Sequence, residues 1–254
     1  MKKLKLIFPI ALLMSIAMWS CQKPATQEAA SSDPVPNALT DEEKAAGWEL
    51  LFDGATLDGW KRYNHDTIGP LWTVKEGMIV CDGTALSEGS KDLGSLTSIK
   101  TFGNFDLSVE WMITPGGNSG ILYHVVESPE YKTDYATGPE YQVMDDAGWK
   151  GDSLNAAQKV GSNYDMFEAP ATKKVLPPGE WNTSRIVYNN GHVEHYLNGE
   201  KTVEFDEDSE EYNKRYQQSK WVGFPGWNKS KTGAISLQEH GAPVYYRSIK
   251  IKAL

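Results

Sequence analysis

Cysteine is scarce in this chain, which contains only Cys21 and Cys81 among 254 residues. If Cys21 carries a lipid, as argued below, no internal disulfide can form. Cys81 lies in the apolar stretch GMIVCDG, which predicts a small buried side chain. No histidine or other base accompanies it in a recognisable pattern, and this disfavours a catalytic thiol.

Positive charge is also under-represented, since 25 lysines and arginines face 34 acidic residues, giving a formal net charge of −9. Proteins that bind nucleic acid neutralise phosphates with basic side chains, so this balance argues against a nucleic-acid partner. It also argues against a substrate rich in acidic groups. The motifs GxGxxG, HExxH and CxxC and the Walker loop are absent, so a phosphate cradle and a zinc–thiolate site have no support.

The apolar run Leu6–Met18 is too short for a confident membrane span. Three lysines precede it, as in a secretory signal, and their removal would change the net charge from −9 to −12. A cysteine directly after Ser20 resembles a bacterial lipoprotein cleavage site, although Trp19 and Met18 depart from the usual residues. We predict a lipoprotein signal peptide over residues 1–20 and a lipid anchor on Cys21. An ordinary cleaved signal is the alternative.

A flexible tether is predicted after the anchor. Residues 22–37 are mainly Pro, Ala, Ser, Thr and Gln and have no apolar periodicity. We assign residues 21–46 to the lipidated cysteine and the tether, and residues 47–254 to one domain that is long enough for a real core. No acidic run follows Cys21. We therefore expect a cell-envelope protein that is anchored in the outer membrane and faces the periplasm.

About a dozen short strands are predicted from alternating apolar and polar residues. In FDLSVEWMI, for example, Leu107, Val109 and Trp111 share one face. Asn190-Gly191 and Asn198-Gly199 are strong hairpin turns between three such strands. Because no strands alternate with helices, we predict an all-β fold, a two-sheet sandwich of the jelly-roll kind.

Tryptophans are expected to fill much of the space between the sheets. The candidates are Trp48, Trp60, Trp72, Trp111 and Trp181.

Helices are expected at two places only. One is a short helix or turn over residues 39–46, and the other is a surface helix over residues 206–218, capped by Asp206 or Asp208.

The stretch GPEYQVMDD, residues 138–146, is the strand around which a site is predicted. Tyr141 and Val143 point to one face, whereas Glu140, Gln142 and Met144 point to the other. An acid and an amide together on one face indicate a polar groove more than a solvated edge.

The same alternation turns other polar side chains away from the apolar faces of their strands. These side chains are Glu110, His124, Gln238 and His240. In a jelly roll the concave face of the inner sheet commonly forms a ligand groove. Carboxylates, histidines and amides that converge there would suffice for general acid–base chemistry.

Several of these residues, and also His195, have a purely structural interpretation beside the functional one. Glu110 is compatible with a solvated outward side chain, and His124, flanked by valines, with a structural histidine. His240 precedes Gly241 and could shape a turn. His195 is in phase with Val193 and Leu197, which favours packing on the apolar side.

Seven motifs spread over residues 47–254 resemble one known family. In chain order they are LFDGATLDGW, PGGNSGILYHV, GPEYQVMDD, PPGEWNTSRIV, HYLNGE, GAISLQEHG and VYYRSIKI. Together they resemble the bacterial 3-keto-disaccharide hydrolase domain family. The resemblance implies a concanavalin-like jelly roll and an enzyme that cleaves glycosides whose sugar has first been oxidised to a 3-keto form. One departure is His124, where many relatives carry arginine.

The implied chemistry fits these residue types. A ketone at carbon 3 acidifies the hydrogen on carbon 2, so a base can remove it, the glycosidic oxygen on carbon 1 can leave, and water can add. The resemblance suggests Glu140 as the base, His240 as the acid or the group that polarises the ketone, and Glu110 as a residue that orients a histidine. Contacts to the sugar or enolate are assigned to His124, Gln142, Gln238, Arg247, Asn118 and Asp145.

No cofactor is required by these motifs. A divalent cation held by Glu140 and histidines is compatible with them, but no ligand spacing demands it. Two other functions remain open. One is a conventional glycosidase with two carboxylates such as Glu110 and Glu140. The other is a carbohydrate-binding module without catalysis.

Overall fold

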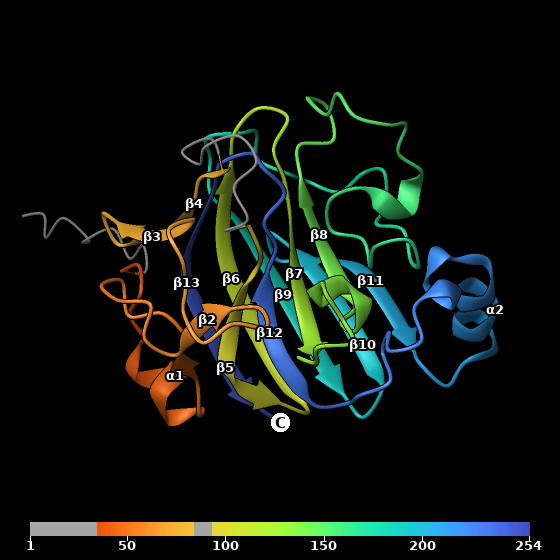
Figure 1. Ribbon diagram of the computed structural model, residues 1–254, viewed down its shortest axis with the longest axis horizontal. Helices are drawn as coiled ribbons and strands as arrows, with labels where there is room; N and C mark the ends of the chain where they lie inside the picture. The colour runs from red at the N-terminus through yellow and green to blue at the C-terminus, as the bar shows by residue number, and fades with distance from the viewer. Residues whose placement is uncertain (1–34, 84–92) are drawn as a thin grey trace, which may run out of the picture. The chain divides into compact units, whose positions relative to one another are not determined.

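The computed structural model describes residues 35–83 and 93–254 (Figure 1). The predicted signal peptide and the lipidation site Cys21 lie outside these ranges. None of the helices within them is both long and apolar enough to cross a membrane.

Two antiparallel sheets form the framework of the described chain. The larger sheet has the strand order β11-β10-β9-β6-β13-β4-β3, with β1 paired to β13. Its strands are β1 (Glu49–Leu50), β3 (Trp72–Lys75), β4 (Met78–Cys81), β6 (Phe105–Ile113), β9 (Asn182–Asn189), β10 (His192–Leu197), β11 (Glu200–Asp206) and β13 (Val244–Ala253).

The smaller sheet has the order β2-β5-β12-β7-β8. Its strands are β2 (Trp60–Arg62), β5 (Leu96–Phe102), β7 (Asn118–Val125), β8 (Glu140–Met144) and β12 (Gly233–Leu237). Strand β12 lies between β5 and β7, so a strand from near the C-terminus pairs with two strands from the first half of the chain (Figure 1). The predicted all-β, two-sheet jelly-roll sandwich is confirmed.

The core between the sheets follows the predicted alternation. Leu107, Val109 and Trp111 of β6 are buried, and so are Tyr141 and Val143 of β8. Burial of apolar area contributes roughly 25 cal/mol per Å², so each of these side chains favours the same placement of its strand. The Trp111 indole N–H donates to the Ser184 hydroxyl over 2.7 Å, which satisfies its one polar atom.

Three of the five predicted core tryptophans are in the core: Trp60, Trp72 and Trp111 are at most 3% exposed. Trp48 and Trp181 are instead half-buried. Each contacts a cation, since the Arg247 guanidinium lies 4.0 Å from the Trp181 ring centroid and the Lys252 ammonium 5.4 Å from that of Trp48. Cysteine 81 is fully buried, as predicted, and burial raises the pKa of its thiol.

The two predicted hairpin turns are confirmed. Both residues of Asn190-Gly191 and of Asn198-Gly199 have positive φ, as a two-residue turn between twisted strands requires. They connect β9, β10 and β11 into the predicted three-stranded meander.

Helices are few and short, as expected. Helix α1 (Asp41–Ala45) begins with a capping box formed by Thr40 and Glu43. The Glu43 carboxylate also pairs with Lys250 of β13, and the Asn37 side-chain amide donates to the Gly77 carbonyl over 2.8 Å. Residues before the expected domain boundary at Gly47 therefore contact the sandwich.

Helix α2 (Glu210–Gln218) is capped by Ser209, whose hydroxyl accepts from the Tyr212 backbone N–H over 3.1 Å. The predicted caps, Asp206 and Asp208, were wrong because β11 continues through Asp206 and the helix starts later. The 3-10 turns within the described ranges include η2 (Asp134–Ala136), η3 (Ala156–Gln158) and η4 (Lys220–Gly223).

A matched pair of isoleucines tests this packing. Ile121 on β7 is 0% exposed, whereas Ile99 on β5 is 60% exposed. We expect Ile121→Ala to lower the free energy of unfolding by about 2–5 kcal/mol, because it leaves a cavity between the sheets. Ile99→Ala should change it by less than about 0.5 kcal/mol. Denaturant unfolding measures both, and equal losses would contradict the packing described.

Candidate active site

A cavity of about 230 Å³ opens on the face of the smaller sheet that points away from the core. Strands β7 and β8 and the end of β12 supply polar side chains to it, and irregular segments close its sides. The lining residues are Asn118, Tyr135, Glu140, Gln142, Tyr164, Lys220, Gln238 and His240. The polar face predicted for β8 is therefore the floor of a cavity.

The pairing of three strands brings these side chains together. Gln142 of β8 pairs with Gly120 of β7, and the Gln238 backbone N–H donates to the Gly120 carbonyl over 2.9 Å. Gly120 also makes room for the acid, because a Cβ at this position would collide with the Glu140 carboxylate. A glycine at the centre of the floor thus allows an acid to lie flat against the sheet.

Glu140 is the one carboxylic acid among the described residues that line this cavity. Glu140 is 4% exposed. Its pKa is raised from 4.5 to about 8, and burial is the main cause. The Lys220 charge opposes this shift, the Asp134 charge adds to it, and a hydrogen bond from Gln238 opposes it. A carboxyl group with a pKa this close to neutrality is suited to accept a proton from a weakly acidic carbon.

The two amides beside Glu140 differ in what they offer a ligand. The Gln142 amide N–H donates to the Gln158 carbonyl over 3.1 Å, and its oxygen accepts from the Val143 N–H over 3.0 Å. Gln142 is therefore held by the protein. The side-chain oxygen of Asn118 is buried and has no hydrogen-bond partner in the described part of the chain. It is the acceptor that a bound hydroxyl group would satisfy.

Three lining residues were not predicted from the sequence: Tyr135, Tyr164 and Lys220. All lie in irregular segments or 3-10 turns, where alternation assigns no face. The Lys220 ammonium lies 4.3 Å from the Tyr164 ring centroid. Desolvation lowers the pKa of Lys220, although the charges of Glu140 and Asp165 oppose this. A cation and an acid thus line the same cavity, and their charges interact.

His240 lies at the rim of the cavity, whereas Asp145 is not one of its lining residues. His240 is exposed, and its ring centroid is 5.9 Å from that of Trp149. The Asp145 carboxylate accepts from the Gly116 N–H over 2.9 Å and from the Gly148 N–H over 3.0 Å. Asp145 therefore holds the loop that carries Trp149, and it does not line the cavity as predicted.

His124 is not in the cavity, and its predicted direction was wrong. Ser236 and Ala234 of β12 pair with Leu122 and Val125 of β7, so β7 contains one extra residue, and His124 has a φ of +54°. This bulge breaks the alternation and turns the imidazole into the core.

The environment of the His124 ring is structural. The ring is 0% exposed, contacts Tyr188 with centroids 4.3 Å apart, and its Nε2 bonds the Gly103 carbonyl at 2.9 Å. His195 is likewise buried, as predicted, with its ring centroid 4.9 Å from that of Tyr141. Burial lowers the pKa of His195 to about 3, so it is a neutral core residue.

Glu110 and Arg247 belong to the other sheet, so the predicted convergence with Glu140 was wrong. They pair across β6 and β13, with Arg247 Nε 2.6 Å from Glu110 Oε2. Their neighbours Trp111 and Tyr246 are in the core, so both charged side chains face outward from the larger sheet. The alternation was correct for each strand, but it does not tell which sheet the strand joins.

One group of metal-ligand type occurs among the described residues, and it is remote from Glu140. It comprises His192, Glu194 and Glu204 on β10 and β11. Lys201 binds both of these acids, and His192 Nδ1 bonds the Asp206 carboxylate at 2.7 Å. The cation considered for Glu140 and histidines remains a prediction.

Comparisons with known proteins place this geometry in context. Residues 47–252 match the family described as 3-keto-alpha-glucoside-1,2-lyase-like domains. The chain is 31% identical to a 3-keto-disaccharide hydrolase of Bacteroides thetaiotaomicron, in an alignment of 288 positions that covers 98% of this chain and 99% of that protein.

Two crystal structures from Parabacteroides distasonis ATCC 8503, both provisionally described as glycosyl hydrolases, are also similar. The first has a TM-score of 0.79 and 42% identity, and the match covers 87% of this chain and 100% of that chain. The second has a TM-score of 0.62 and 24% identity over 82% of this chain and 99% of that chain, and it shares the fold.

The burial of Glu140 predicts an unusual dependence of stability on pH. Its pKa is higher in the folded state, so ionisation disfavours folding, and stability is lost as pH rises from about 5 to about 8. Glu140→Gln removes the charge and keeps the shape. Its free energy of unfolding should exceed that of the wild type by a margin that grows over this range to a few kcal/mol, on the order expected for such a shift.

Denaturant unfolding at several pH values measures this margin. Ile99→Ala, which removes no titratable group, is the control and should follow the pH dependence of the wild type. A margin for Glu140→Gln that is constant between pH 5 and 8 would contradict the raised pKa.

Proposed function

This chain belongs to the family of 3-keto-alpha-glucoside-1,2-lyase-like domains, and we propose that it cleaves glycosides and disaccharides whose sugar carries a ketone at carbon 3. It is a glycoside-cleaving enzyme related to a 3-keto-disaccharide hydrolase. The observation that most supports this function is the buried Glu140 in the cavity wall, whose pKa of about 8 suits proton abstraction from carbon.

The reaction begins at carbon 2 of the sugar. The Glu140 carboxylate removes the proton from carbon 2, and the electron pair of the C2–H bond passes into an enolate with carbon 3 and its oxygen. The enolate then collapses, the bond from carbon 1 to the glycosidic oxygen breaks, and that oxygen leaves with the electron pair and takes up a proton. Water adds its oxygen to carbon 1 and a proton to carbon 2, so the net reaction is hydrolysis.

Other residues of the cavity suit the charges that develop. Lys220 lines the same cavity, and this supports assigning its ammonium group to the stabilisation of the negative charge on the enolate oxygen, an interaction that strengthens as the charge forms. Gln238 orients Glu140 by a hydrogen bond, and the free oxygen of Asn118 accepts a sugar hydroxyl. Of the two roles predicted for His240, its position at the rim favours that of the acid for the leaving oxygen.

The test is a matched pair of substrates, a plain glucoside and its 3-keto derivative, each with and without chelator. We expect release of the leaving group only from the keto compound, with kcat/KM rising with pH towards the pKa of Glu140 at about 8. Glu140→Gln should lower kcat/KM by roughly 10²–10⁴-fold, because the base is lost. Glu110→Gln, on the outer face of the other sheet, is the control and should change it little.

Other outcomes would change the proposal. Release from both substrates would indicate a conventional glycosidase, and full activity of Glu140→Gln would show that another group is the base. Loss of activity with chelator would assign a divalent cation to the reaction.

We also propose that Cys21 is lipidated and that the enzyme is held at the outer membrane, facing the periplasm, because the sequence around Cys21 resembles a lipoprotein cleavage site. Cys21→Ser should then move the protein from the membrane fraction to the soluble fraction of fractionated cells. Cys81→Ala, at the other cysteine, is the control and should stay with the membranes. Equal fractionation of the two variants would contradict the anchor.

A further inference from the structure

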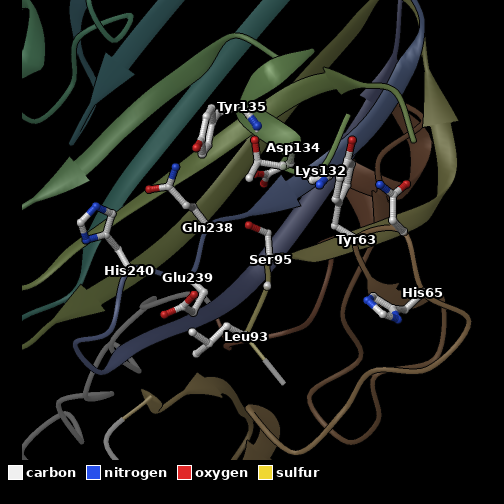
Figure 2. A pocket seen from close by; sticks show the side chains of 13 residues that line it. Tyr63, His65, Leu93, Ser95, Lys132, Asp134, Tyr135, Gln238, Glu239 and His240 are labelled. Carbon is white, nitrogen blue, oxygen red and sulfur yellow. The ribbon is translucent and has the colours of Figure 1, made fainter. Parts of the chain in front are cut away.

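A second cavity, of about 260 Å³, adjoins the first one. The two share three wall residues, Tyr135, Gln238 and His240. Figure 2 shows Gln238 and His240 on one side of the second cavity and Tyr63 and His65 on the opposite side. Together the two cavities reach the size range that is typical of small-molecule sites, whereas each alone is smaller.

The shared wall is where the proposed reaction would break its bond. Carbon 1, which carries the leaving oxygen, is the ring atom next to the carbon 2 that Glu140 deprotonates. Gln238 bonds the Glu140 carboxylate and also lines the second cavity, and His240, the acid for the leaving oxygen, lines both. A keto sugar seated against Glu140 with its leaving oxygen towards His240 therefore directs the leaving group into the second cavity.

We propose that the second cavity is the subsite for the leaving group, and that this group is a neutral sugar ring. This inference rests on the proposed function. The two cavities have similar volumes, as expected if each holds one ring. A small alcohol as leaving group would make no contact with the far wall at Tyr63 and His65.

The walls of the second cavity combine apolar and polar groups. Tyr135 and Leu93 offer apolar surface, and Lys132 is exposed and makes no ion pair or hydrogen bond with the described residues. A sugar ring has the matching character, with apolar C–H faces and a rim of hydroxyl groups. Charges of both signs line the cavity, since Glu239 faces it as well, and this favours a neutral sugar over a charged one.

A buried polar network holds this wall in place. Asp134, 3% exposed, accepts from the Ser236 hydroxyl over 2.6 Å and from the Tyr135 N–H over 2.9 Å. Ser236 in turn lies 3.2 Å from the Thr97 hydroxyl. Because β5, β12 and the η2 turn are joined in this way, the second cavity is attached to the same rigid sheet as the first.

The test compares two substrates that differ only in the leaving group, a methyl 3-keto-glucoside and a 3-keto-glucosyl-glucose disaccharide. The measured quantity is the ratio of kcat/KM for the disaccharide to kcat/KM for the methyl glycoside. Lys132→Ala and His65→Ala should each lower this ratio by about tenfold, the loss expected for one hydrogen bond from a charged or polar group. Lys214→Ala is the matched control, since Lys214 is exposed on α2 and lines neither cavity.

Binding to the Glu140→Gln variant gives a second readout that does not depend on turnover. By calorimetry, this variant should bind the 3-keto disaccharide more tightly than the methyl glycoside, and addition of Lys132→Ala should reduce this preference by about tenfold. Unchanged ratios for both wall variants, or equal losses on both substrates, would overturn the subsite. Full activity of Glu140→Gln on both substrates would instead overturn the proposed function, so the two failures are distinguishable.

Discussion

Burial of the Glu140 carboxyl group is the interaction on which the rest of the site depends. A carboxylate loses much of its hydration inside a protein, and here this loss raises the pKa to about 8. The group remains ionisable because Lys220 and Gln238 partly compensate, and because Gly120 leaves space beside it. Without this environment, Glu140 would be an ordinary surface acid and too weak a base to compete for a proton on carbon.

The packing of the two sheets compensates for the destabilising burial of the Glu140 carboxyl group. Glu140 alternates on β8 with Tyr141 and Val143, which are anchored in the core, so the destabilising carboxyl group is attached to a strand that apolar burial holds in register. Sites on paired strands are also more rigid than sites on loops, and proton transfer requires close positioning. The burial of apolar side chains on the same strand thus offsets the loss of stability caused by the buried Glu140 carboxyl group.

The sequence predicted the floor of the site and missed its sides. Alternation along β8 correctly placed Glu140 and Gln142 on one face. Gln238, which directly follows β12, lies in the same cavity because only β7 separates β12 from β8. The direction predicted for His124 was wrong because a bulge, one extra residue in β7, locally reverses the alternation, and the sequence carries no clear signal of it. The predicted convergence of Glu110 with Glu140 was wrong because β6 belongs to the larger sheet. Which sheet a strand joins depends on long-range pairing, which the residues of that strand alone do not determine. Lys220 lies in a 3-10 turn, where no periodicity indicates a direction.

The most direct test of the account is to follow the hydrogen on carbon 2 during cleavage. A 3-keto glycoside would be converted in deuterium oxide, and the released 3-keto sugar examined by NMR early in the reaction, against enzyme-free substrate and product controls. Elimination followed by addition of water predicts deuterium at carbon 2 of the released sugar, because that carbon loses its proton and regains one from solvent. Complete retention of the original hydrogen at carbon 2 after cleavage would contradict the role of Glu140 as the base.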